Sequence, residues 1–548
     1  MDKRLLLGDE AIALGALHAG LSGVYAYPGT PSTEITEFIQ AATGYGKKKV
    51  MVGGHELNTN GTIHSRWCSN EKTAMEAALG MSYAGKRALV CMKHVGMNVC
   101  ADAFVNSSMT GTNGGLVVLA ADDPSMHSSQ NEQDSRFYGK FAMMPVLEPS
   151  NQQEAYDMMD EAYALSERFK TPVLLRVVTR LAHSRANVEV KSESAPENAL
   201  HPDEGKHWIL LPAIARKQNE LLIGKQASLL EASESSRFNR LTISGQNCKG
   251  VIACGIGYNY VMEAGREDIN ILKVSQYPLP VDKIRELARQ SSEILVVEDG
   301  QPVVEELVKG ILSADYTVKG RLTGDLPRTG ELNPDNVLMA LSGDKGEWPT
   351  ANSPINVVGR PPALCQGCGH RDMYAALKEV VGEYDGARVF GDIGCYTLGA
   401  LPPFQAINSC VDMGASITMA KGASDAGVWP AVAVIGDSTF THSGMTGLLD
   451  CVNDKANVTI IISDNLTTGM TGGQDSQGTY KFEQICLGLG VEPEHLHVVT
   501  PLPKNMEEIK TVMREEFNYN GVSVIIPRRE CIQTLGRKLR NKKKEEGK

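Results

Sequence analysis

Short apolar runs alternate with alanine-rich, helix-favouring stretches in two separate parts of the chain. In the first part the apolar runs are GVYAYPG, RALVCM, GGLVVLAA and TPVLLRVV, and the helical stretch NEKTAMEAALGMSYAG lies between the first two. In the last part the runs are ARVFGDIG, PAVAVIGDS, VTIIISDN, HVVT and VSVIIPRRE. This alternation is typical of parallel sheets whose strands are joined by crossover helices. We therefore expect an α/β protein with parallel sheets flanked by helices.

The length of 548 residues is too great for one hydrophobic core, so we expect several domains. The alternation predicts a first α/β domain over 1–190 and a last one over 355–540. Between them, 191–247 is polar and is expected to be a linker with helical content, whereas 248–345 is expected to be a small α/β domain. The lysine-rich tail, 541–548, is expected to be a solvated, frayed end.

Composition excludes several classes of protein. With 42% hydrophobic and 22% charged residues, the chain has the composition of a globular protein. The net charge of -11 argues against nucleic acid as the main partner. The opening MDKRLLLGDEAIALGALHAG is interrupted by Gly, Asp and Glu, which predicts an amphipathic helix rather than a signal peptide, and no apolar run is long enough to span a membrane. We expect a cytoplasmic protein without membrane contact, whose twelve cysteines are reduced core residues or metal ligands.

Polar residues directly follow two neighbouring apolar runs in VIGDSTFTHSGMTGLLDCVNDKANVTIIISDN. Gly436, Asp437 and Ser438 follow the first run, and Asn465 follows the second. Open α/β sheets bind ligands at these carboxyl ends of their strands. The carboxylate and the amide oxygen are hard ligands suited to Mg²⁺, and a glycine before a helix lets backbone N–H groups approach a diphosphate. Either fragment alone is explained by a turn or a helix cap, but together they resemble the thiamine diphosphate motif, in which the Thr467 carbonyl is a third metal ligand.

Enzymes with this motif also need a glutamate on a facing domain, which hydrogen-bonds N1′ of the aminopyrimidine ring. The stretch SNEKTAMEAALGMSYAG resembles the helix that carries it, with Glu71 in the matching place. Glu76 lies five residues further on and is expected to face elsewhere. A glutamate at a helix start is also favoured by the helix dipole alone, so this second interpretation stays open.

The stretch ALCQGCGHRD holds a Cys-x-x-Cys pair, Cys365 and Cys368, in front of a helical run. Such a pair supplies half of a four-thiolate site, which suits either zinc or an iron-sulfur cluster. Structural zinc sites usually combine two such pairs, which favours the cluster here.

Taken together, these stretches resemble the large (alpha) subunits of the indolepyruvate-type 2-oxoacid:ferredoxin oxidoreductases. The matching stretches are YPGTPSTEI, NEKTAMEAALG, MKHVGMNVCAD, DDPSMHSSQNEQDSR, LCQGCGHRD, FGDIGCYTLG, MGASITMAKG and GDSTFTHSGMTGL. The resemblance implies a multidomain thiamine-diphosphate-binding fold. In it, 1–190 is the pyrimidine-binding domain, 248–345 is similar to the transketolase C-terminal domain, and 355–540 is the diphosphate-binding domain.

The resemblance also implies the ligands of each cofactor. A 4Fe-4S cluster is expected on Cys365, Cys368, Cys395 and Cys531, with Cys410 and Cys486 as alternatives to Cys531. The remaining cysteines, expected in the core, are Cys68, Cys91, Cys100, Cys248, Cys254 and Cys451. Thiamine diphosphate is expected to contact Glu71, Gly394, Met413, Gly436, Asp437, Ser438, Asn465, Thr467 and Gly469, and Mg²⁺ to bind Asp437, Asn465 and Thr467.

The implied reaction is oxidative decarboxylation of an arylpyruvate, an indolepyruvate-type 2-oxoacid, to the aryl-acetyl-CoA, with electrons passing through the cluster to ferredoxin. Glu71, Thr30 and His442 are the expected catalytic residues, and Thr30 of YPGTPS lies near the substrate carboxylate in relatives. Four further residues of the matching stretches are open between carboxylate binding, proton relay and purely structural hydrogen bonds: Lys93, His94, His127 and Arg136.

Relatives of this kind work with a small beta subunit, so we expect an alpha2beta2-type assembly. Their alpha chains often end in a ferredoxin-like domain, whereas this sequence stops soon after Cys531, and we expect electrons to leave it through one cluster. Two other functions stay open: a non-redox thiamine-dependent 2-oxoacid decarboxylase, and a scaffold that binds the cofactor without turnover.

Overall fold

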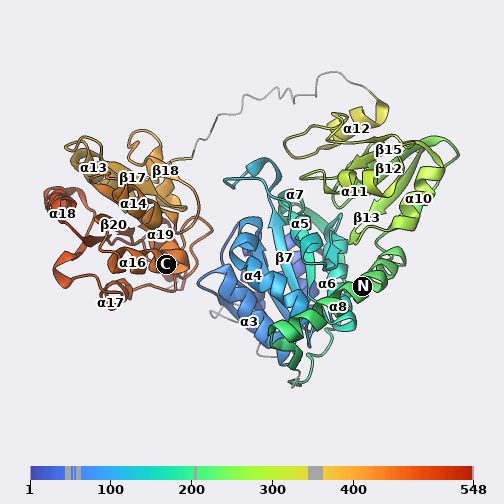
Figure 1. The fold of residues 1–548 in the computed structure, drawn as a ribbon, viewed down its shortest axis with the longest axis horizontal. Coiled ribbons are helices and arrows are strands. Elements are labelled where there is room, and N and C mark those ends of the chain that lie inside the picture. The colour runs from blue at the N-terminus through green and yellow to red at the C-terminus, as the bar shows by residue number, and fades with distance from the viewer. Residues whose placement is uncertain are drawn as a thin grey trace. The chain divides into compact units, whose positions relative to one another are not determined.

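The computed structural model describes residues 2–43, 51–52, 55–56, 63–202, 206–343, 359 and 362–545. The chain forms two compact units, 1–353 and 354–548, each built on sheets flanked by helices (Figure 1). The prediction of an α/β protein with parallel sheets is confirmed. The boundary expected between 345 and 355 lies outside the described residues.

The first unit contains a seven-stranded sheet in the order β14-β8-β9-β7-β6-β2-β5. Its strands are β2 (Gly23–Ala26), β5 (His64–Trp67), β6 (Ala88–Lys93), β7 (Leu116–Asp122), β8 (Val146–Leu147), β9 (Val173–Val178) and β14 (Gln276–Tyr277). All neighbours are parallel except β14, which is antiparallel to β8. Every residue of β6, β7 and β9 is buried, which explains why both faces of these strands are apolar apart from Lys93, Asp122 and Arg176.

Helices cover both faces of this sheet. They are α1 (Gly8–His18), α2 (Thr33–Ala42), α3 (Glu71–Tyr83), α4 (His94–Thr110), α5 (Arg136–Phe141), α6 (Gln152–Phe169) and α7 (Thr179–His183). Leu89 and Cys91 of β6 pack into the core shared with α1, α2 and α6, whereas Val90 and Met92 pack into the core shared with α3 and α4. The alternation of side chains along a strand therefore separates two hydrophobic layers.

The expectation of one amphipathic helix at the start of the chain is only partly right: a helix forms over Gly8–His18, but the residues before it do not belong to it and its faces are not amphipathic. Residues Asp2–Leu7 form strand β1, which pairs antiparallel with β10 (Arg185–Val190). Helix α1 follows, and all of its residues except Glu10 are buried, because it packs against both α2 and α6. A partner strand more than a hundred residues away decides the conformation of this segment.

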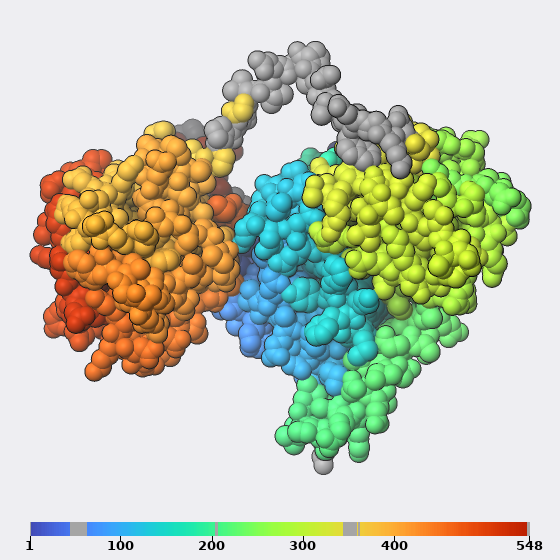
Figure 2. Space-filling model, turned by 45° about the horizontal axis from the view of Figure 1, so that its top comes forward, coloured from blue at the N-terminus to red at the C-terminus, as the bar shows by residue number. Residues whose placement is uncertain are grey.

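A five-stranded sheet, in the order β11-β13-β12-β15-β16, forms the middle of the chain. Its strands are β11 (Arg240–Thr242), β12 (Cys248–Cys254), β13 (Ile269–Val274), β15 (Ser291–Val297) and β16 (Val318–Lys319). The accompanying helices are α9 (Gly257–Glu263), α10 (Val281–Arg289), α11 (Val303–Ile311) and α12 (Pro334–Ser342). The polar segment before it contains the long helix α8 (Pro212–Glu234), which contacts α4 and α10 and stands out as a green lobe of the first unit in Figure 2.

A buried network of ion pairs joins the first sheet to the middle domain. Arg136 pairs with Asp134 at 2.5 Å and with Glu298 of the middle domain at 2.9 Å. Arg176 pairs with Asp122 at 2.6 Å. Removing one partner of such a network leaves a buried charge uncompensated, which is strongly destabilising. Arg136 therefore holds two domains together, which is the structural role left open for it above.

The second unit contains a six-stranded, wholly parallel sheet in the order β18-β17-β19-β20-β22-β21. Its strands are β17 (Arg388–Gly391), β18 (Ser409–Cys410), β19 (Ala431–Gly436), β20 (Val458–Ser463), β21 (Leu496–Val499) and β22 (Val522–Pro527). Its helices are α13 (Gly369–Val381), α14 (Ala415–Asp425), α15 (Asp437–Thr439), α16 (Met445–Asn453), α17 (Phe482–Gly488), α18 (Met506–Asn518) and α19 (Ile532–Glu545).

Two hydrophobic layers again enclose the sheet, one with α13 and α18 and the other with α14, α16 and α17. The expected frayed tail is helical as far as Glu545, as part of α19. Among the helices described, none is both long and apolar enough to cross a membrane.

Candidate functional site

Four neighbouring strands of the second unit deliver predicted ligands to one edge of the sheet. Cys395 follows β17, Asp437 follows β19, Asn465 follows β20 and Cys531 follows β22. Because these strands are parallel neighbours, their carboxyl ends meet at the same edge, which is where open α/β sheets bind ligands. Helix α13 leads into the amino end of β17, so its own start, directly after Cys368, lies at this edge as well.

The four predicted cluster ligands line one cavity of about 110 Å³. These are Cys365, Cys368, Cys395 and Cys531, and the wall also includes His370, Asn465 and Gly469. The Cys-x-x-Cys turn is closed by the Cys368 N–H, which donates to the Cys365 carbonyl at 3.1 Å. The Cys531 N–H donates to the Asn465 carbonyl at 3.0 Å, which fixes the end of β22 against the end of β20.

Neither alternative to Cys531 reaches this cavity. The Cys410 thiol lies on β18 and donates to the Asp392 carbonyl at 3.5 Å. Cys486 is buried on α17, inside the hydrophobic layer formed with α14 and α16. The structure thus groups the four cysteines that the resemblance implies and keeps both alternatives apart from them.

The thiols are spaced more widely than the ligands of a single zinc ion. In the part of the chain that the structure describes, no three of their sulfur atoms lie within 4.8 Å of one another. Thiolates on one tetrahedral zinc, with bonds near 2.3 Å, are about 3.8 Å apart. In a cubane each thiolate binds a different iron atom, so the wider spacing fits a cluster better. Burial, with a smaller contribution from the neighbouring thiols, raises the pKa of Cys395 to about 12, so a metal is needed to keep this group deprotonated.

Asp437 and Asn465 converge on one backbone nitrogen. The Thr467 N–H donates to Oδ2 of Asp437 at 3.0 Å and to Oδ1 of Asn465 at 3.2 Å, while the Ser438 N–H donates to Oδ1 of Asp437 at 2.8 Å. Burial raises the pKa of Asp437 to about 8, and the charge of Asp464 contributes in the same direction. Among the described residues no cationic side chain pairs with Asp437, so the carboxylate needs a proton or a bound cation. This donor set fits Mg²⁺.

Magnesium binding is expected to depend on pH in a defined way. Since Asp437 holds a proton up to about pH 8, Mg²⁺ must displace it, and the apparent affinity should rise by up to about tenfold per pH unit up to that value and then level off. The cofactor-free fold should lose stability over the same range, because the unfolded carboxyl titrates near 3.8. Calorimetry in two buffers of different ionisation enthalpy should show about one proton released per Mg²⁺ near neutral pH. An affinity independent of pH over this range would contradict the assignment.

His370 was not singled out from the sequence, yet it connects the thiol cavity to the magnesium ligands. Its ring is buried, with Nδ1 2.7 Å from Oγ of Ser463 and Nε2 3.2 Å from Nδ2 of Asn465. Burial lowers the pKa of His370 to about 4, so the ring is neutral and one nitrogen is an acceptor. Because the Asn465 amide nitrogen can only donate, Nε2 accepts, and the amide oxygen is left to face Asp437 and Thr467.

Replacing His370 with alanine should therefore weaken Mg²⁺ and thiamine diphosphate binding by about 10–100-fold, the usual effect of losing a residue that orients a metal ligand. The measurement is equilibrium binding to the cofactor-free protein. His495→Gln is the matched control, since that histidine pairs with Glu516 and lies outside the cavity wall. Equal affinities in the two variants would show that His370 does not orient the amide.

Two glycines of the predicted cofactor site accommodate one aromatic ring. A Cβ atom on Gly394 or on Gly436 would lie 2.4 Å from the ring of Tyr396, which is buried. The Tyr396 hydroxyl donates to Oγ1 of Thr439 at 3.1 Å, so the ring is fixed against the start of the helix that follows Gly436. A Cβ atom on Gly469 would lie 3.4 Å from the Cys395 sulfur, which places this predicted cofactor residue against the thiols.

The remaining predicted residues of this unit lie close to the same edge. Ser438 is buried on α15, and its hydroxyl lies 2.5 Å from that of Thr468. Met413 is half-buried in the turn before α14, where the next residue, Gly414, donates its N–H to Asp392 at 2.9 Å. Asp392 thus fixes this turn, although its role was not predicted from the sequence.

His442 lies in a π-helical turn, η4 (Phe440–Gly444), between α15 and α16. Irregular turns of this type are common at functional sites, but His442 does not line the thiol cavity.

In the first unit, Glu71 is buried at a capped helix start, next to a glycine that leaves space for its side chain. It is the first residue of α3 and is buried, and the preceding Asn70 caps the helix by accepting the Thr73 N–H at 2.9 Å. A Cβ atom on Gly96 of α4 would lie 2.8 Å from a carboxylate oxygen of Glu71, so only glycine leaves room for it. Glu76 is exposed and pairs with Lys72, which confirms that it faces elsewhere.

Thr30 and Lys93 lie at the carboxyl edge of the first sheet. Thr30 is half-buried in the turn after β2, and a Cβ atom on the neighbouring Gly29 would lie 3.1 Å from the Cβ of Lys93. Lys93 ends β6 and donates to the Ser128 carbonyl at 2.6 Å. These two residues follow adjacent strands, so the structure brings the substrate-binding candidates of this unit together.

The two histidines left open above have different surroundings. His94 begins α4 and is fully buried, with Nε2 3.2 Å from the Asn131 carbonyl. His127 is half-exposed, and its Nε2 lies 3.3 Å from the Glu331 carboxylate. The described contacts therefore give both side chains structural partners.

Two family models match the chain. The model described as "Pyruvate flavodoxin/ferredoxin oxidoreductase, thiamine diP-bdg" matches residues 14–221. The model described as "Thiamine pyrophosphate enzyme, C-terminal TPP binding domain" matches residues 392–526. The first range contains Glu71, and the second contains both Asp437 and Asn465. Both halves of the predicted thiamine diphosphate site thus fall within thiamine-binding domains.

Whole-length relatives are also found. The indolepyruvate oxidoreductase subunit IorA of Archaeoglobus fulgidus is 38% identical and covers 99% of this chain and 89% of its own length. The protein of the same name from Methanothermobacter thermautotrophicus is 36% identical, over 98% of this chain and 88% of its own length. A solved 2-oxoglutarate:ferredoxin oxidoreductase from Magnetococcus marinus has a TM-score of 0.49 at 15% identity, covering 62% of this chain and 65% of that chain, a likeness too remote to locate any residue. The similarity to the IorA proteins extends over nearly the whole chain. The chain is therefore an oxidoreductase that belongs to the indolepyruvate oxidoreductase subunit IorA family.

Proposed function

We propose that the chain, together with a small beta subunit, catalyses the oxidative decarboxylation of an arylpyruvate of the indolepyruvate type. The products are the aryl-acetyl-CoA and carbon dioxide, and the electrons leave through a 4Fe-4S cluster to ferredoxin. One observation carries the proposal: Asn465 and Gly469, which are predicted to contact thiamine diphosphate, also form part of the wall of the four-cysteine cavity. The residues proposed to bind the cofactor and those proposed to bind the cluster are thus adjacent in one domain.

The diphosphate end of the cofactor is assigned to the edge of the second sheet. Asp437, Asn465 and the Thr467 carbonyl are proposed to hold Mg²⁺, and the amides at the start of α15 to approach the diphosphate oxygens. The buried, uncompensated Asp437 carboxylate supports this assignment, because a cation removes the cost of burying it. When bound, thiamine diphosphate supplies the electron sink for decarboxylation.

Glu71 is proposed to hold and move the proton of the aminopyrimidine end. Its burial at the start of α3 keeps water away from the carboxylate, and Gly96 leaves space for the side chain. Thr30 and Lys93, at the same edge of the first sheet, are proposed to bind the carboxylate of the 2-oxoacid. Burial lowers the pKa of Lys93, and the nearby Asp123 acts in the opposite direction.

The redox part of the proposal is supported by the thiols. A non-redox decarboxylase has no need for four cysteines against its cofactor site, whereas a cluster held there accepts electrons one at a time. The preference for an arylpyruvate is proposed from the names of the IorA relatives and from the sequence resemblance. Coenzyme A, ferredoxin, the beta subunit, an alpha2beta2-type assembly and a cytoplasmic location are proposed on the same basis.

The substrate class is tested with the alpha chain and its small subunit, purified together without oxygen. Indolepyruvate, phenylpyruvate, pyruvate and 2-oxoglutarate are each supplied with coenzyme A and a viologen dye. We expect dye reduction with the two arylpyruvates and a much lower kcat/KM for the other two acids. A preference for pyruvate or 2-oxoglutarate would reject the substrate assignment but leave the oxidoreductase intact.

A further inference from the structure

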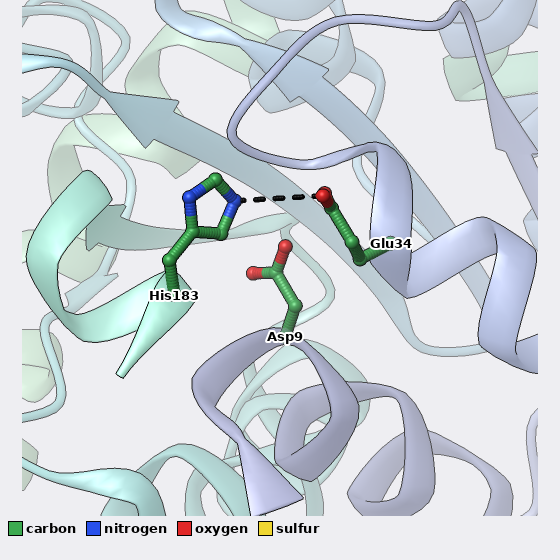
Figure 3. A group of neighbouring side chains, drawn as sticks. All are labelled: Asp9, Glu34 and His183. Atoms are coloured by element: carbon green, nitrogen blue, oxygen red, sulfur yellow. Dashed lines mark ion pairs between the residues drawn. The ribbon is translucent and has the colours of Figure 1, made fainter. Parts of the chain in front are cut away.

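Three side chains outside the proposed active site meet in the first unit. Asp9 of α1, Glu34 of α2 and His183 of α7 point toward one another (Figure 3). One ligand atom from each lies within 4.8 Å of the other two, and the His183 ring nitrogen Nε2 is 3.6 Å from a Glu34 oxygen. None of these residues has a part in the proposed reaction.

The central carboxylate of this group is buried without an N–H donor. Asp9 is 0% exposed, and among the described residues neither of its oxygens accepts a hydrogen bond from an N–H or hydroxyl group, while the Glu34 carboxyl group lies close enough to share a proton with it. The second oxygen of Glu34 is likewise buried and has no N–H or hydroxyl donor among the described residues. In Figure 3 the Asp9 carboxylate points into the space between Glu34 and His183. A buried carboxylate with no donor is costly unless it gains a proton or a cation.

The surrounding charges make the Asp9 carboxylate still more dependent on a proton or a cation. Burial raises the pKa of Asp9 well above its usual value, and the next causes are the negative charges of Glu34 and Glu10. No lysine or arginine figures among these influences on Asp9 in the described structure. His183 pairs with Glu34, and the hydrogen bond with this carboxylate raises the pKa of the imidazole.

The donor set points to a particular class of ion. One imidazole nitrogen and two carboxylate oxygens suit Zn²⁺ and similar first-row divalent ions, whereas Ca²⁺ and Mg²⁺ prefer oxygen ligands only. The Glu34 and His183 side chains are 38% and 35% exposed, so an ion can reach the buried Asp9 from solvent between them. Three protein ligands leave a position for water, which the partly open side of the group allows.

We propose that Asp9, Glu34 and His183 form a second metal site, which binds Zn²⁺ or a similar transition-metal ion. The ion ties the starts of α1 and α2 to the end of α7. Glu34 lies four residues after Thr30 in the chain, so the site also anchors the turn that carries this substrate-binding candidate. The proposal does not depend on the reaction proposed above.

The test uses the cluster-loaded complex with its small subunit, handled without oxygen and dialysed against a weak chelator in the presence of Mg²⁺. Zn²⁺ is titrated by equilibrium dialysis into the wild type, Asp9→Asn, His183→Gln and the control His127→Gln. The control removes a histidine that also pairs with a glutamate, but that belongs to no group of three ligand atoms within 4.8 Å of one another among the described residues. We expect the wild type and the control to bind one more Zn²⁺ per alpha chain than Asp9→Asn and His183→Gln. Equal stoichiometry in all four proteins would overturn the proposal.

Two further measurements keep the outcome clear. X-ray absorption of the additional zinc should show nitrogen and oxygen ligands only, and sulfur ligands would assign it to the thiols instead. Zn²⁺ should raise the melting temperature of the wild type but not of Asp9→Asn, an isosteric change that removes the buried charge and is expected to leave the fold intact without metal. An equal shift in both would also reject the site, and would favour two carboxyl groups that share a proton.

Discussion

Replacing Glu71 with glutamine is expected to lower the turnover of the 2-oxoacid by about 10²–10⁴-fold, the usual contribution of a positioned acid–base group. Glutamine has the same size and fills the space left by Gly96, but its amide cannot take up or release the proton that the carboxylate moves. The change should therefore act on kcat at saturating cofactor, with little effect on the fold. The measurement is steady-state reduction of a viologen dye without oxygen.

Glu76→Gln is the matched control for this prediction. Glu76 is on the same helix but is exposed and pairs with Lys72, so its replacement should leave kcat within about twofold of the wild type. A Glu71→Gln enzyme that keeps wild-type turnover at saturating cofactor would remove this residue from the mechanism. A loss in both variants would point to a structural effect on α3.

Replacing Cys531 with serine is expected to abolish electron transfer to the dye and to reduce the iron and acid-labile sulfide bound per chain. The proposed fourth thiolate belongs to the segment after β22, which the Cys531 N–H holds against the Asn465 carbonyl. This backbone bond does not depend on the side chain, so the serine variant should keep the segment in place and lose only the sulfur ligand. Iron analysis and the spectrum of the reduced cluster are the measurements.

Cys410→Ser is the control for this change, because Cys410 belongs to the same domain and is half-buried but does not line the cavity. It should bind iron and reduce the dye like the wild type. If Cys410→Ser loses the cluster while Cys531→Ser keeps it, the ligand set is wrong. Binding of zinc instead of iron in the wild type would reject the cluster itself.

Much of the fold could be predicted because its central strands are buried on both faces. Strands such as β7 and β20 are continuous apolar runs, and the helices between them are long enough to form crossovers. Strand β1 could not be predicted in this way, since the neighbour with which it pairs in the described structure is β10, at the far end of the first domain. The acidic residues of α1 suggested a solvent-exposed face, but Asp9 is fully buried in the fold, so the prediction of an amphipathic helix failed there.

Several of the predicted site residues lie shortly after apolar runs. Asp437, Asn465 and Cys531 could be found because parallel neighbouring strands end at the same edge of the sheet. His370 and Asp392 could not, since their importance lies in contacts with residues far away in sequence, such as Asn465 and Gly414. A signal for His370 was its position two residues after Cys368, at the start of a helix that begins at the cavity.

The most direct test of the proposed chemistry compares the products formed from indolepyruvate with and without a one-electron acceptor. The complex of alpha chain and small subunit is supplied with indolepyruvate and coenzyme A in the absence of oxygen. With the viologen dye we expect the aryl-acetyl-CoA, with two electrons recovered in the dye for each acyl-CoA, and without the dye we expect almost no product. Formation of the free aldehyde at the same rate with or without the dye would contradict this chemistry and identify a non-redox decarboxylase.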